Sequence, residues 1–232
     1  MPYRTTTCYT ATSHKDRSVT TVAAASQVRP RHPGGVGGGW NTGGVSTPHT
    51  HSPGPTADAS VRTARATDAP ALGLVQATVF RDTYAAVLRQ EALDQFEGPR
   101  FATVWRRSLE HPPTPAHRAL VACAGEQVVG LAAHGPAQDV DRGRPESSGE
   151  ILVLGVHPDA RRQGHGSRLL NACADTLRAH DHSSVVAWVP AGDEATRAFL
   201  ATGGLQPDGA WRERVIGPEG ETLREIRVVA DL

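Results

Sequence analysis

Residues 151–170 join a run of apolar residues to a basic loop that contains glycines. The run at 151–156 is almost wholly aliphatic, which is typical of a buried central strand. Two arginines then precede Gly164 and Gly166, and an amphipathic helix is predicted to follow. A loop that enters a helix presents free backbone N–H groups and the positive end of the helix dipole. The segment therefore predicts an anion-binding site.

Two common nucleotide-binding loops do not fit this segment. A dinucleotide-binding fingerprint needs a third glycine at the position of Leu169. A Walker A loop ends in Gly-Lys-Ser/Thr, and Lys15 is the only lysine in the sequence. The residues alone still allow a tight strand-to-helix turn with solvated arginines.

The elements expected around this segment are those of a mixed α/β domain. Apolar runs separated by Gly125-Glu126 and by 217–220 favour antiparallel hairpins rather than a repeating βαβ series. The patterns predict strands at 61–65, 119–124, 127–134, 150–156, 185–189, 211–216 and 223–229, and helices from residue 67 and at 85–96, 103–109, 166–180 and 193–202.

The anion-binding segment also resembles the motif of a known family. The motif Arg/Gln-x-x-Gly-x-Gly/Ala of the GNAT family of N-acetyltransferases is similar to the string Val156-x-Pro158-x-x-Arg161-x-x-Gly164-x-Gly166-x-x-Leu169-Leu170. Downstream, residues 193–205 resemble the Asn-x-x-Ala-x-x-Phe-Tyr-x-x-x-Gly-Phe segment of that family. The resemblance extends over roughly residues 61–232.

This resemblance implies a GNAT acyl-CoA N-acyltransferase fold over residues 61–232. The fold is α/β, with a central, mostly antiparallel sheet of about seven strands flanked by helices. The resemblance also implies acetyl-CoA as cosubstrate, an amine of a small molecule or peptide as acceptor, direct attack in a ternary complex, and no metal. The residues it places against the cosubstrate are Leu154, Gly155, Val156, Arg161, Arg162, Gln163, Gly164, His165, Gly166, Ser167, Asp193 and Phe199.

Glu150 is the candidate general base for such a reaction. It precedes Gly164 by 14 residues, the offset of the glutamate base in the histone-acetyltransferase branch of the family. A carboxylate beside buried strands suits a base that works through water. The alternative is a glutamate that begins the strand and faces solvent. Asp82 and Tyr84 are candidate acceptor-binding residues, because the first helical region often forms the acceptor pocket in the family.

Two departures from the family pattern affect the expected chemistry. Leu200 stands where a tyrosine commonly acts as general acid, and Asp193 stands where asparagine is common. Leucine cannot donate a proton, so another group or water protonates the thiolate, or the thiolate leaves unaided. An alkyl thiol with a pKa of about 8.5 is a tolerable leaving group. Polarisation of the thioester is expected from a backbone N–H of Val156 or Leu154. The missing tyrosine also allows an alternative function, a non-catalytic acyl-CoA sensor or interaction module.

Composition limits the remaining possibilities. Residues 1–60 contain no Leu, Ile or Phe and are predicted to form a disordered, low-complexity tail, with partner binding as the functional alternative. The 24 basic and 24 acidic residues balance, which argues against nucleic acid or an anionic membrane as partner. No long apolar run or signal peptide is evident.

Three widely spaced cysteines argue against a disulfide framework and indicate a reducing cytoplasm. A monomer or a homodimer is expected.

Overall fold

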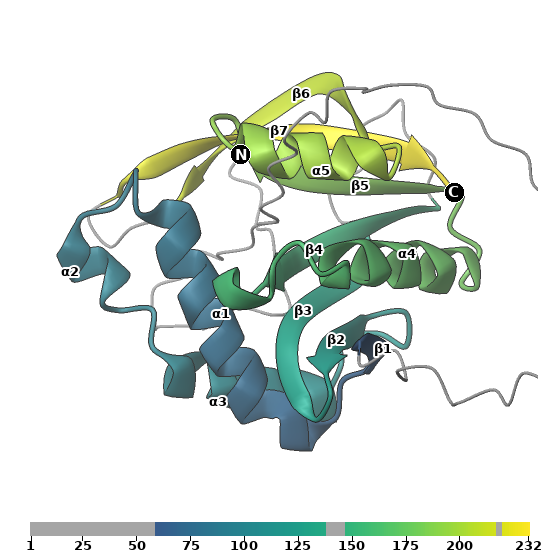
Figure 1. The fold of residues 1–232 in the computed structure, drawn as a ribbon. Helices are drawn as coiled ribbons and strands as arrows, with labels where there is room; N and C mark the ends of the chain where they lie inside the picture. The colour runs from purple at the N-terminus through teal and green to yellow at the C-terminus, as the bar shows by residue number, and fades with distance from the viewer. Residues whose placement is uncertain (1–58, 138–146, 217–219) are drawn as a thin grey trace, which may run out of the picture.

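The computed structural model of this protein describes residues 59–137, 147–216 and 220–232 (Figure 1). The predicted tail 1–60 lies outside these residues except at its end. The seven strands are β1 (Ala59–Thr63), β2 (Arg118–Ala124), β3 (Gln127–Pro136), β4 (Ser148–Val156), β5 (Ser184–Pro190), β6 (Gln206–Val215) and β7 (Thr222–Asp231). The helices are α1 (Ala69–Tyr84), α2 (Gln90–Leu93), α3 (Gly98–Glu110), α4 (His165–Arg178) and α5 (Glu194–Thr202), with short 3-10 turns at Ala66–Asp68 and Pro158–Ala160.

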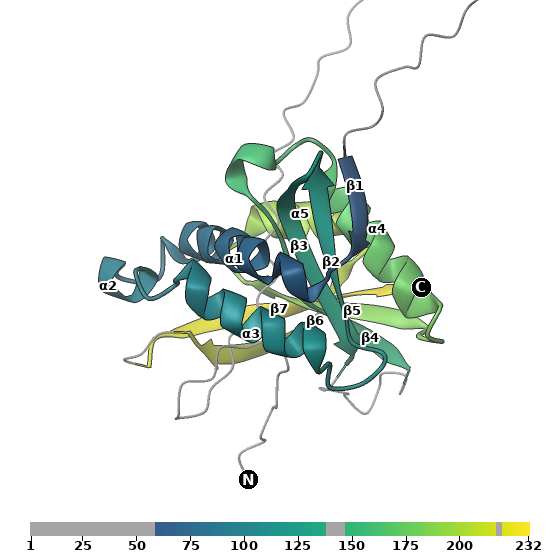
Figure 2. The ribbon, with the colours of Figure 1, turned by 90° about the horizontal axis from the view of Figure 1, so that it is seen from below.

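The strands form one sheet of order β1-β2-β3-β4-β5-β7-β6. The pairs β1–β2, β2–β3, β3–β4, β5–β7 and β6–β7 are antiparallel, whereas β4 and β5 are parallel. Helices flank both faces: Figure 2 shows α1 and α3 on one side of the first strands and α4 on the other. This architecture confirms the predicted mixed α/β fold.

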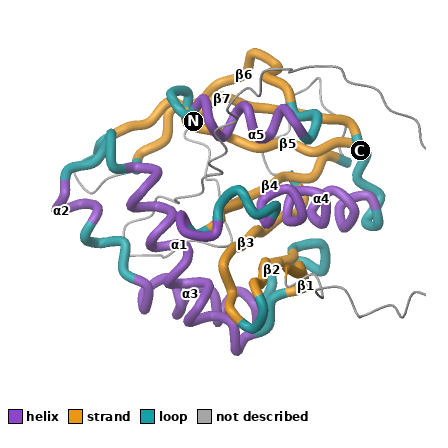
Figure 3. The backbone as a smooth tube through the Cα atoms, in the orientation of Figure 1, coloured by secondary structure: helices purple, strands orange, loops and turns teal. Residues whose placement is uncertain are grey.

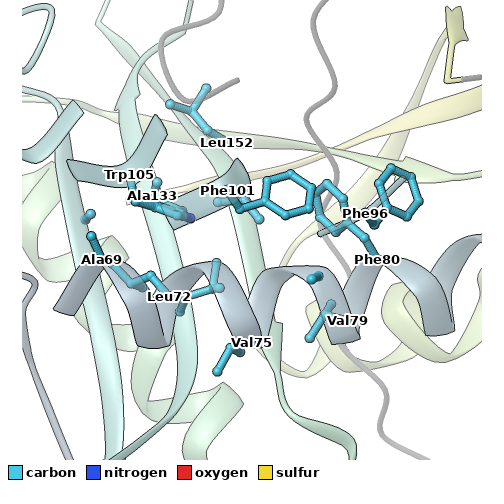
Figure 4. Close-up of a cluster of buried hydrophobic side chains, with 14 of the residues drawn as sticks. Ala69, Leu72, Val75, Val79, Phe80, Phe96, Phe101, Trp105, Ala133 and Leu152 are labelled. Carbon is cyan, nitrogen blue, oxygen red and sulfur yellow. The ribbon is translucent and has the colours of Figure 1, made fainter. Parts of the chain in front are cut away.

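Two apolar clusters lie on the two faces of the sheet. The first lies between the sheet and helices α1 and α3, and it contains Phe80, Phe101 and Trp105 (Figure 4). Inside it, the Trp105 indole N–H donates a hydrogen bond of 2.6 Å to the Gln76 side-chain oxygen, so the buried polar groups are satisfied. The second cluster lies between the sheet and helices α4 and α5 and contains Leu169.

Two helices differ from their predicted extents. The segment 85–96 was predicted to be one helix, but α2 is a single turn at Gln90–Leu93. The apolar side chains Leu88 and Phe96 on either side of this turn are nonetheless buried. Helix α3 begins at Gly98 rather than at residue 103, because Pro99 lies in its first turn, where a missing N–H costs nothing. The apolar residues of 85–96 are therefore buried by packing against other elements, although the segment does not form one long helix.

Candidate functional site

Strands β4 and β5 are paired over only part of their length. Parallel pairs run from Ser148 with Ser184 to Ile151 with Ala187. Beyond these pairs, the described part of β4 is hydrogen-bonded to β3, and that of β5 to β7. The strands therefore diverge, and Figure 1 shows the backbones of β4 and β5 moving apart toward the side where α1 lies; we call this divergence the opening.

A β-bulge lies at the point of divergence. Ala133 is opposite Val153, but its neighbour His134 is opposite Ile151, so Leu152 is an extra residue in β4. A bulge bends the strand that carries it and increases the local twist. We attribute the divergence of β4 from β5 to this bulge, because the last β4–β5 pair involves the residue immediately before it.

Beyond the bulge, β4 presents backbone groups to the opening. The His157 N–H donates to the Val129 carbonyl at 2.8 Å, so the adjacent pair Val156–Gly130 is one whose N–H and C=O groups point away from β3. Leu154 lies two residues earlier and has the same orientation. The N–H groups of Leu154 and Val156 therefore face the opening, as a thioester carbonyl would require.

The loop between β4 and α4 ends at a helix N-terminus (Figure 3). Gly164 is the N-cap of α4 and has a φ of 80°, the left-handed region that favours glycine. No side chain of the described residues caps this helix end. The Arg168 guanidinium donates to the Gln163 carbonyl at 3.0 Å and so adds positive charge beside the loop. The N–H groups of the first turn are therefore available to an anion, as predicted for residues 162–167.

Helix α5 supports the start of α4. A Cβ at Gly166 would lie 3.2 Å from the Phe199 ring, so a glycine there allows the two helices to pack closely. Asp193 caps α5: its carboxylate accepts from the Thr196 N–H at 2.9 Å and from the Thr196 hydroxyl at 2.6 Å. Phe199 and Asp193 thus have structural contacts of their own, and their contact with the cosubstrate stays a prediction.

Arg161, which was predicted to bind the cosubstrate, forms an ion pair with Asp82, which was predicted to bind the acceptor. The Arg161 side chain donates to the Val156 carbonyl at 3.1 Å and to the Asp82 carboxylate at 2.7 Å. Arg161 thus connects the end of β4 to α1. Both residues line a hollow of about 320 Å³ between the end of α1 and the start of α5, together with Thr83 and Pro190.

Tyr84 lies away from this hollow and is fully buried. Its ring packs edge-to-face on Phe80 with centroids 5.6 Å apart. Its hydroxyl accepts a hydrogen bond of 3.0 Å from Arg214, which in turn forms an ion pair of 2.7 Å with the wholly buried Glu225. These contacts tie the end of α1 to the hairpin of β6 and β7. Contact of Tyr84 with an acceptor stays a prediction.

Glu150 is buried in the middle of the sheet, with 7% of its surface exposed. The neighbouring Gly149 faces α4, because a Cβ there would collide with Leu177. Successive residues of a strand point to opposite faces, so the Glu150 side chain points away from α4. The solvent-facing alternative for Glu150 does not hold.

Sequence reasoning missed one buried polar residue on the same face. His117 precedes β2 in a turn, where no periodic pattern marks it, and it is 4% exposed. Leu200, at the expected tyrosine position, is fully buried in the cluster beneath α4 and α5. Within the described ranges, no group of three or more His, Cys, Asp or Glu residues could hold a metal ion. None of the described helices is both long and apolar enough to cross a membrane.

Comparisons with known proteins give consistent results. Residues 85–203, about half of the chain, match the family described as acetyltransferase (GNAT). No curated protein matches the sequence of this chain. Similar solved structures include the ribosomal-protein-alanine N-acetyltransferase of Brucella melitensis, at 25% identity over 75% of this chain and 99% of that chain, with a TM-score of 0.56.

Two further structures contain the cosubstrate or its product. The PaiA N-acetyltransferase of Thermoplasma acidophilum in complex with coenzyme A is 14% identical over 75% of this chain and 99% of that chain, with a TM-score of 0.56. YncA, a putative acetyltransferase of Salmonella typhimurium with acetyl-CoA, is 21% identical over 75% and 94%, with a TM-score of 0.54. These likenesses confirm the predicted fold class.

Proposed function

This chain belongs to the acetyltransferase (GNAT) family, and on that premise we propose that it transfers the acetyl group of acetyl-CoA to a primary amine of a small molecule or peptide. The observation that carries the proposal is the alignment of the β4–β5 opening with the N-terminus of α4. The first turn of α4 offers N–H donors to phosphates. The N–H groups of Leu154 and Val156 in the opening offer donors to a carbonyl oxygen.

The proposed reaction is direct attack of the amine on the thioester carbonyl. The first turn of α4 and the loop residues 161–164 hold the pyrophosphate. The N–H groups of Leu154 and Val156 hold the extended arm of the cosubstrate and polarise the thioester carbonyl. Arg161 donates to the Val156 carbonyl, and the His157 N–H donates to the Val129 carbonyl, so the backbone on both sides of the Val156–His157 peptide bond is held before the cosubstrate arrives. The oxyanion that forms is then stabilised by donors that do not need to reorganise.

Glu150 acts as general base in this scheme. An ammonium acceptor loses a proton through water to the Glu150 carboxylate, and the neutral amine then attacks. The C–N bond forms and gives the oxyanion, whose collapse breaks the C–S bond. The thiolate leaves with its electron pair and takes up, through water, the second proton that the attacking nitrogen loses. Burial of Glu150 on the face away from α4 supports the assignment, because the base is then shielded from bulk solvent. The Asp82 carboxylate is paired with Arg161 at 2.7 Å, beside the loop proposed to hold the pyrophosphate, so its contact with the acceptor amine stays a prediction.

A second candidate function is acyl-CoA binding without catalysis. Leu200 favours it, because a fully buried leucine supplies no proton to the leaving thiolate. In that case the chain would act as a sensor or interaction module. For either function, we propose that residues 61–232 form the working domain and that it acts in the cytoplasm as a monomer or homodimer. The unpaired state of Cys123 and Cys173 supports a reducing compartment.

The two candidates differ in turnover. The protein is mixed with acetyl-CoA and a panel of small-molecule and peptide amines, and the release of free thiol is measured. Transfer predicts thiol release that depends on the amine, and Glu150→Gln should lower kcat by about 100-fold, within the range for loss of a general base. Acetyl-CoA affinity should stay unchanged in this variant. Tight acetyl-CoA binding without turnover on any amine would favour the binding module, and an active Glu150→Gln variant would refute the assigned base.

A further inference from the structure

Trp188 borders the opening on the same face of the sheet as Glu150. The last β4–β5 pair joins Ile151 to Ala187, so Trp188 is the first residue of β5 beyond the paired region. Ala187 packs in the cluster beneath α4 and α5, so the Trp188 side chain points to the other face, as does that of Val186, the partner of Glu150. An acceptor that gives its proton to Glu150 must approach on this face, and Trp188 therefore lies beside its path.

An arginine from β6 lies over the Trp188 ring. The Cζ atom of Arg212 is 4.2 Å from the centre of the ring, which is a cation–π arrangement. The Arg212 Nε–H also donates to the Glu225 carboxylate at 2.7 Å. One contact positions the guanidinium over the ring, and the other holds its Nε edge. Arg212 is therefore fixed in place before any ligand binds, which lowers the entropy that binding would cost.

The remaining donors of this guanidinium are available to a ligand. Neither Nη1 nor Nη2 of Arg212 has a hydrogen-bond partner among the residues that the structure describes. The Arg212 side chain is 25% exposed, against 10% for Arg214 and 7% for Arg227. Adjacent N–H donors on a planar guanidinium match the two oxygens of a carboxylate. Arg212 can thus bind a carboxylate while it keeps its present contacts.

Arg212 shares its carboxylate partner with a second arginine. One oxygen of Glu225 binds Arg212 and the other binds Arg214, each at 2.7 Å. Glu225 is wholly buried and carries a single negative charge, so it compensates the charge of Arg212 only in part. Arg227, whose Cζ lies 5.7 Å from the centre of the Trp188 ring, is itself paired with Asp208 at 2.9 Å. The positive charge over Trp188 therefore attracts an anion at a position that solvent reaches.

From this arrangement we infer that the acceptor carries a carboxylate as well as its amine, and that Arg212 binds this carboxylate. The two ends of such an acceptor meet opposite charges on one face of the sheet. Its ammonium approaches the carboxylate of Glu150 on β4, and its carboxylate approaches the guanidinium that lies over Trp188 of β5. Amino acids and acidic peptides share this chemistry. The inference rests on the proposed function, because it names the acceptor class of that reaction.

The kinetic test compares each acceptor that carries a carboxylate with its neutral amide. Straight-chain amino acids with a terminal amine and short peptides with an acidic side chain are assayed with acetyl-CoA, each beside the corresponding amide, and kcat/KM is measured by thiol release. We expect the best carboxylate acceptor to exceed its amide by at least about tenfold, as for a hydrogen bond to a charged group. The larger ratio, in the amino acids or in the peptides, identifies the source of the carboxylate. No preference for any carboxylate over its amide would overturn the inference.

Substitutions test whether Arg212 is the source of this preference. Arg212→Gln removes the charge, so the preference for the carboxylate should disappear. Arg212→Lys keeps a cation beside Glu225 but has no planar pair of donors, so it should keep only part of the preference. Thermal unfolding of each variant shows whether it is folded. The parental preference in folded Arg212→Gln, or in Arg212→Lys where only that variant folds, would contradict the inference.

The same hairpin offers a matched control. Arg224 also lies over a tryptophan, with its Cζ atom 4.3 Å from the centre of the Trp211 ring. It precedes Glu225 in β7, so its side chain points to the opposite face of the sheet. Arg224→Gln therefore removes the same charge and the same kind of contact away from the proposed site. This variant should keep the parental preference, and its loss there would show that the preference does not depend on a site at Arg212.

A binding measurement separates this inference from the proposed function. The Nε–H resonance of Arg212, assigned by comparison with Arg212→Lys, is followed by NMR while the amino acid or its amide is added in the presence of coenzyme A. We expect a shift with the carboxylate form and none with the amide, whether or not any amine is acetylated. If the parent shows no turnover but this shift occurs, the proposed function fails and the carboxylate site stands. Turnover of amines without the shift keeps the proposed function and refutes the carboxylate site.

Discussion

At the scale of single residues, His134 is a buried histidine with an unusual environment. It is fully buried in β3, and neither ring nitrogen has a hydrogen-bond partner among the described residues. Burial is the main cause that lowers its pKa to about 4, and the nearby His180 and Arg118 add to the effect. The ring therefore stays neutral in the folded state until the pH approaches 4, whereas in the unfolded chain it is protonated below a pKa of about 6.5.

This difference predicts a loss of stability in mild acid. Above about pH 6.5 both states are neutral at His134, so the residue adds no pH dependence. As the pH falls from 6.5 toward 4, only the unfolded state gains the proton, and the free energy of unfolding falls. Between pH 7 and pH 5 the loss should be about 2 kcal/mol. Urea unfolding at both pH values measures it.

His134→Leu should remove this contribution, whereas the exposed His111→Gln should keep it. Equal losses in the parent and in His134→Leu would show that His134 is not the responsible group. The sequence indicated that His134 lies on a strand beside the central one, but it could not indicate that both ring nitrogens would lack partners. That property depends on which side chains of other elements surround the ring.

At the scale of elements, α1 lies directly against the functional part of β4. A Cβ at Gly155 would lie 2.9 Å from Cγ1 and 3.3 Å from Cγ2 of Val79. Gly155→Ala should therefore overpack this contact and lower the free energy of unfolding by about 1–3 kcal/mol. Val79→Ala removes the two methyl groups that the new Cβ would meet.

The double variant should be more stable than the sum of the two single changes implies, by at least about 0.5 kcal/mol. Urea unfolding of the parent, both single variants and the double variant completes the cycle. Strict additivity would mean that the cost of Gly155→Ala does not come from the Val79 methyl groups. In sequence terms, Gly155 was predicted to contact the cosubstrate, whereas the structure adds a packing reason for glycine at this position.

The elements themselves were largely predictable from periodicity and turn residues. The strand, loop and helix from 148 to 178 match the expectation closely, because buried runs and glycines are strong local signals. The start of α3 was not predicted, since Pro99 reads as a helix breaker until its place in the first turn is known. The first part of β6 was also missed, because its exposed residues around a bulge at 207–211 show no alternation.

At the scale of the whole molecule, α1 connects the two parts of the sheet that diverge at the opening. Its middle packs on β4 through Val79, and its end reaches β6 through the hydrogen bond from Arg214 to Tyr84. Tyr84→Phe keeps the ring but removes the hydroxyl from a buried arginine. We expect the free energy of unfolding to fall by about 1.5–3 kcal/mol, the range for hydrogen bonds to charged groups.

Urea unfolding tests this expectation. Thr78→Val is the control, because the Thr78 hydroxyl bonds only to the exposed backbone of the same helix among the described contacts. That variant should change the stability by less than about 0.5 kcal/mol. A Tyr84→Phe protein as stable as the parent would show that α1 is held to the hairpin by packing alone.

The site as a whole was less predictable than the fold. The loop and its helix are contiguous, so their role could be predicted from local sequence. Asp82 and Arg161 are 79 positions apart, and their ion pair follows from where α1 crosses β4. His117 and Glu150 lie on the same face of the sheet only through the register of β3 on β4. Long-range register of this kind leaves no local trace in one sequence.

The bulge at Leu152 has a consequence for how this protein can change over generations. Because the opening depends on one extra residue in β4 and not on the identity of its side chain, point substitutions there keep the opening. Loss of the single codon for Leu152 would restore unbroken pairing with β3 and remove the bend, while the later side chains of β4 would keep their faces, because Leu152 and Val153 both lie on the face toward α1. Descendants of this chain should therefore tolerate new residues at this position more readily than a change of length.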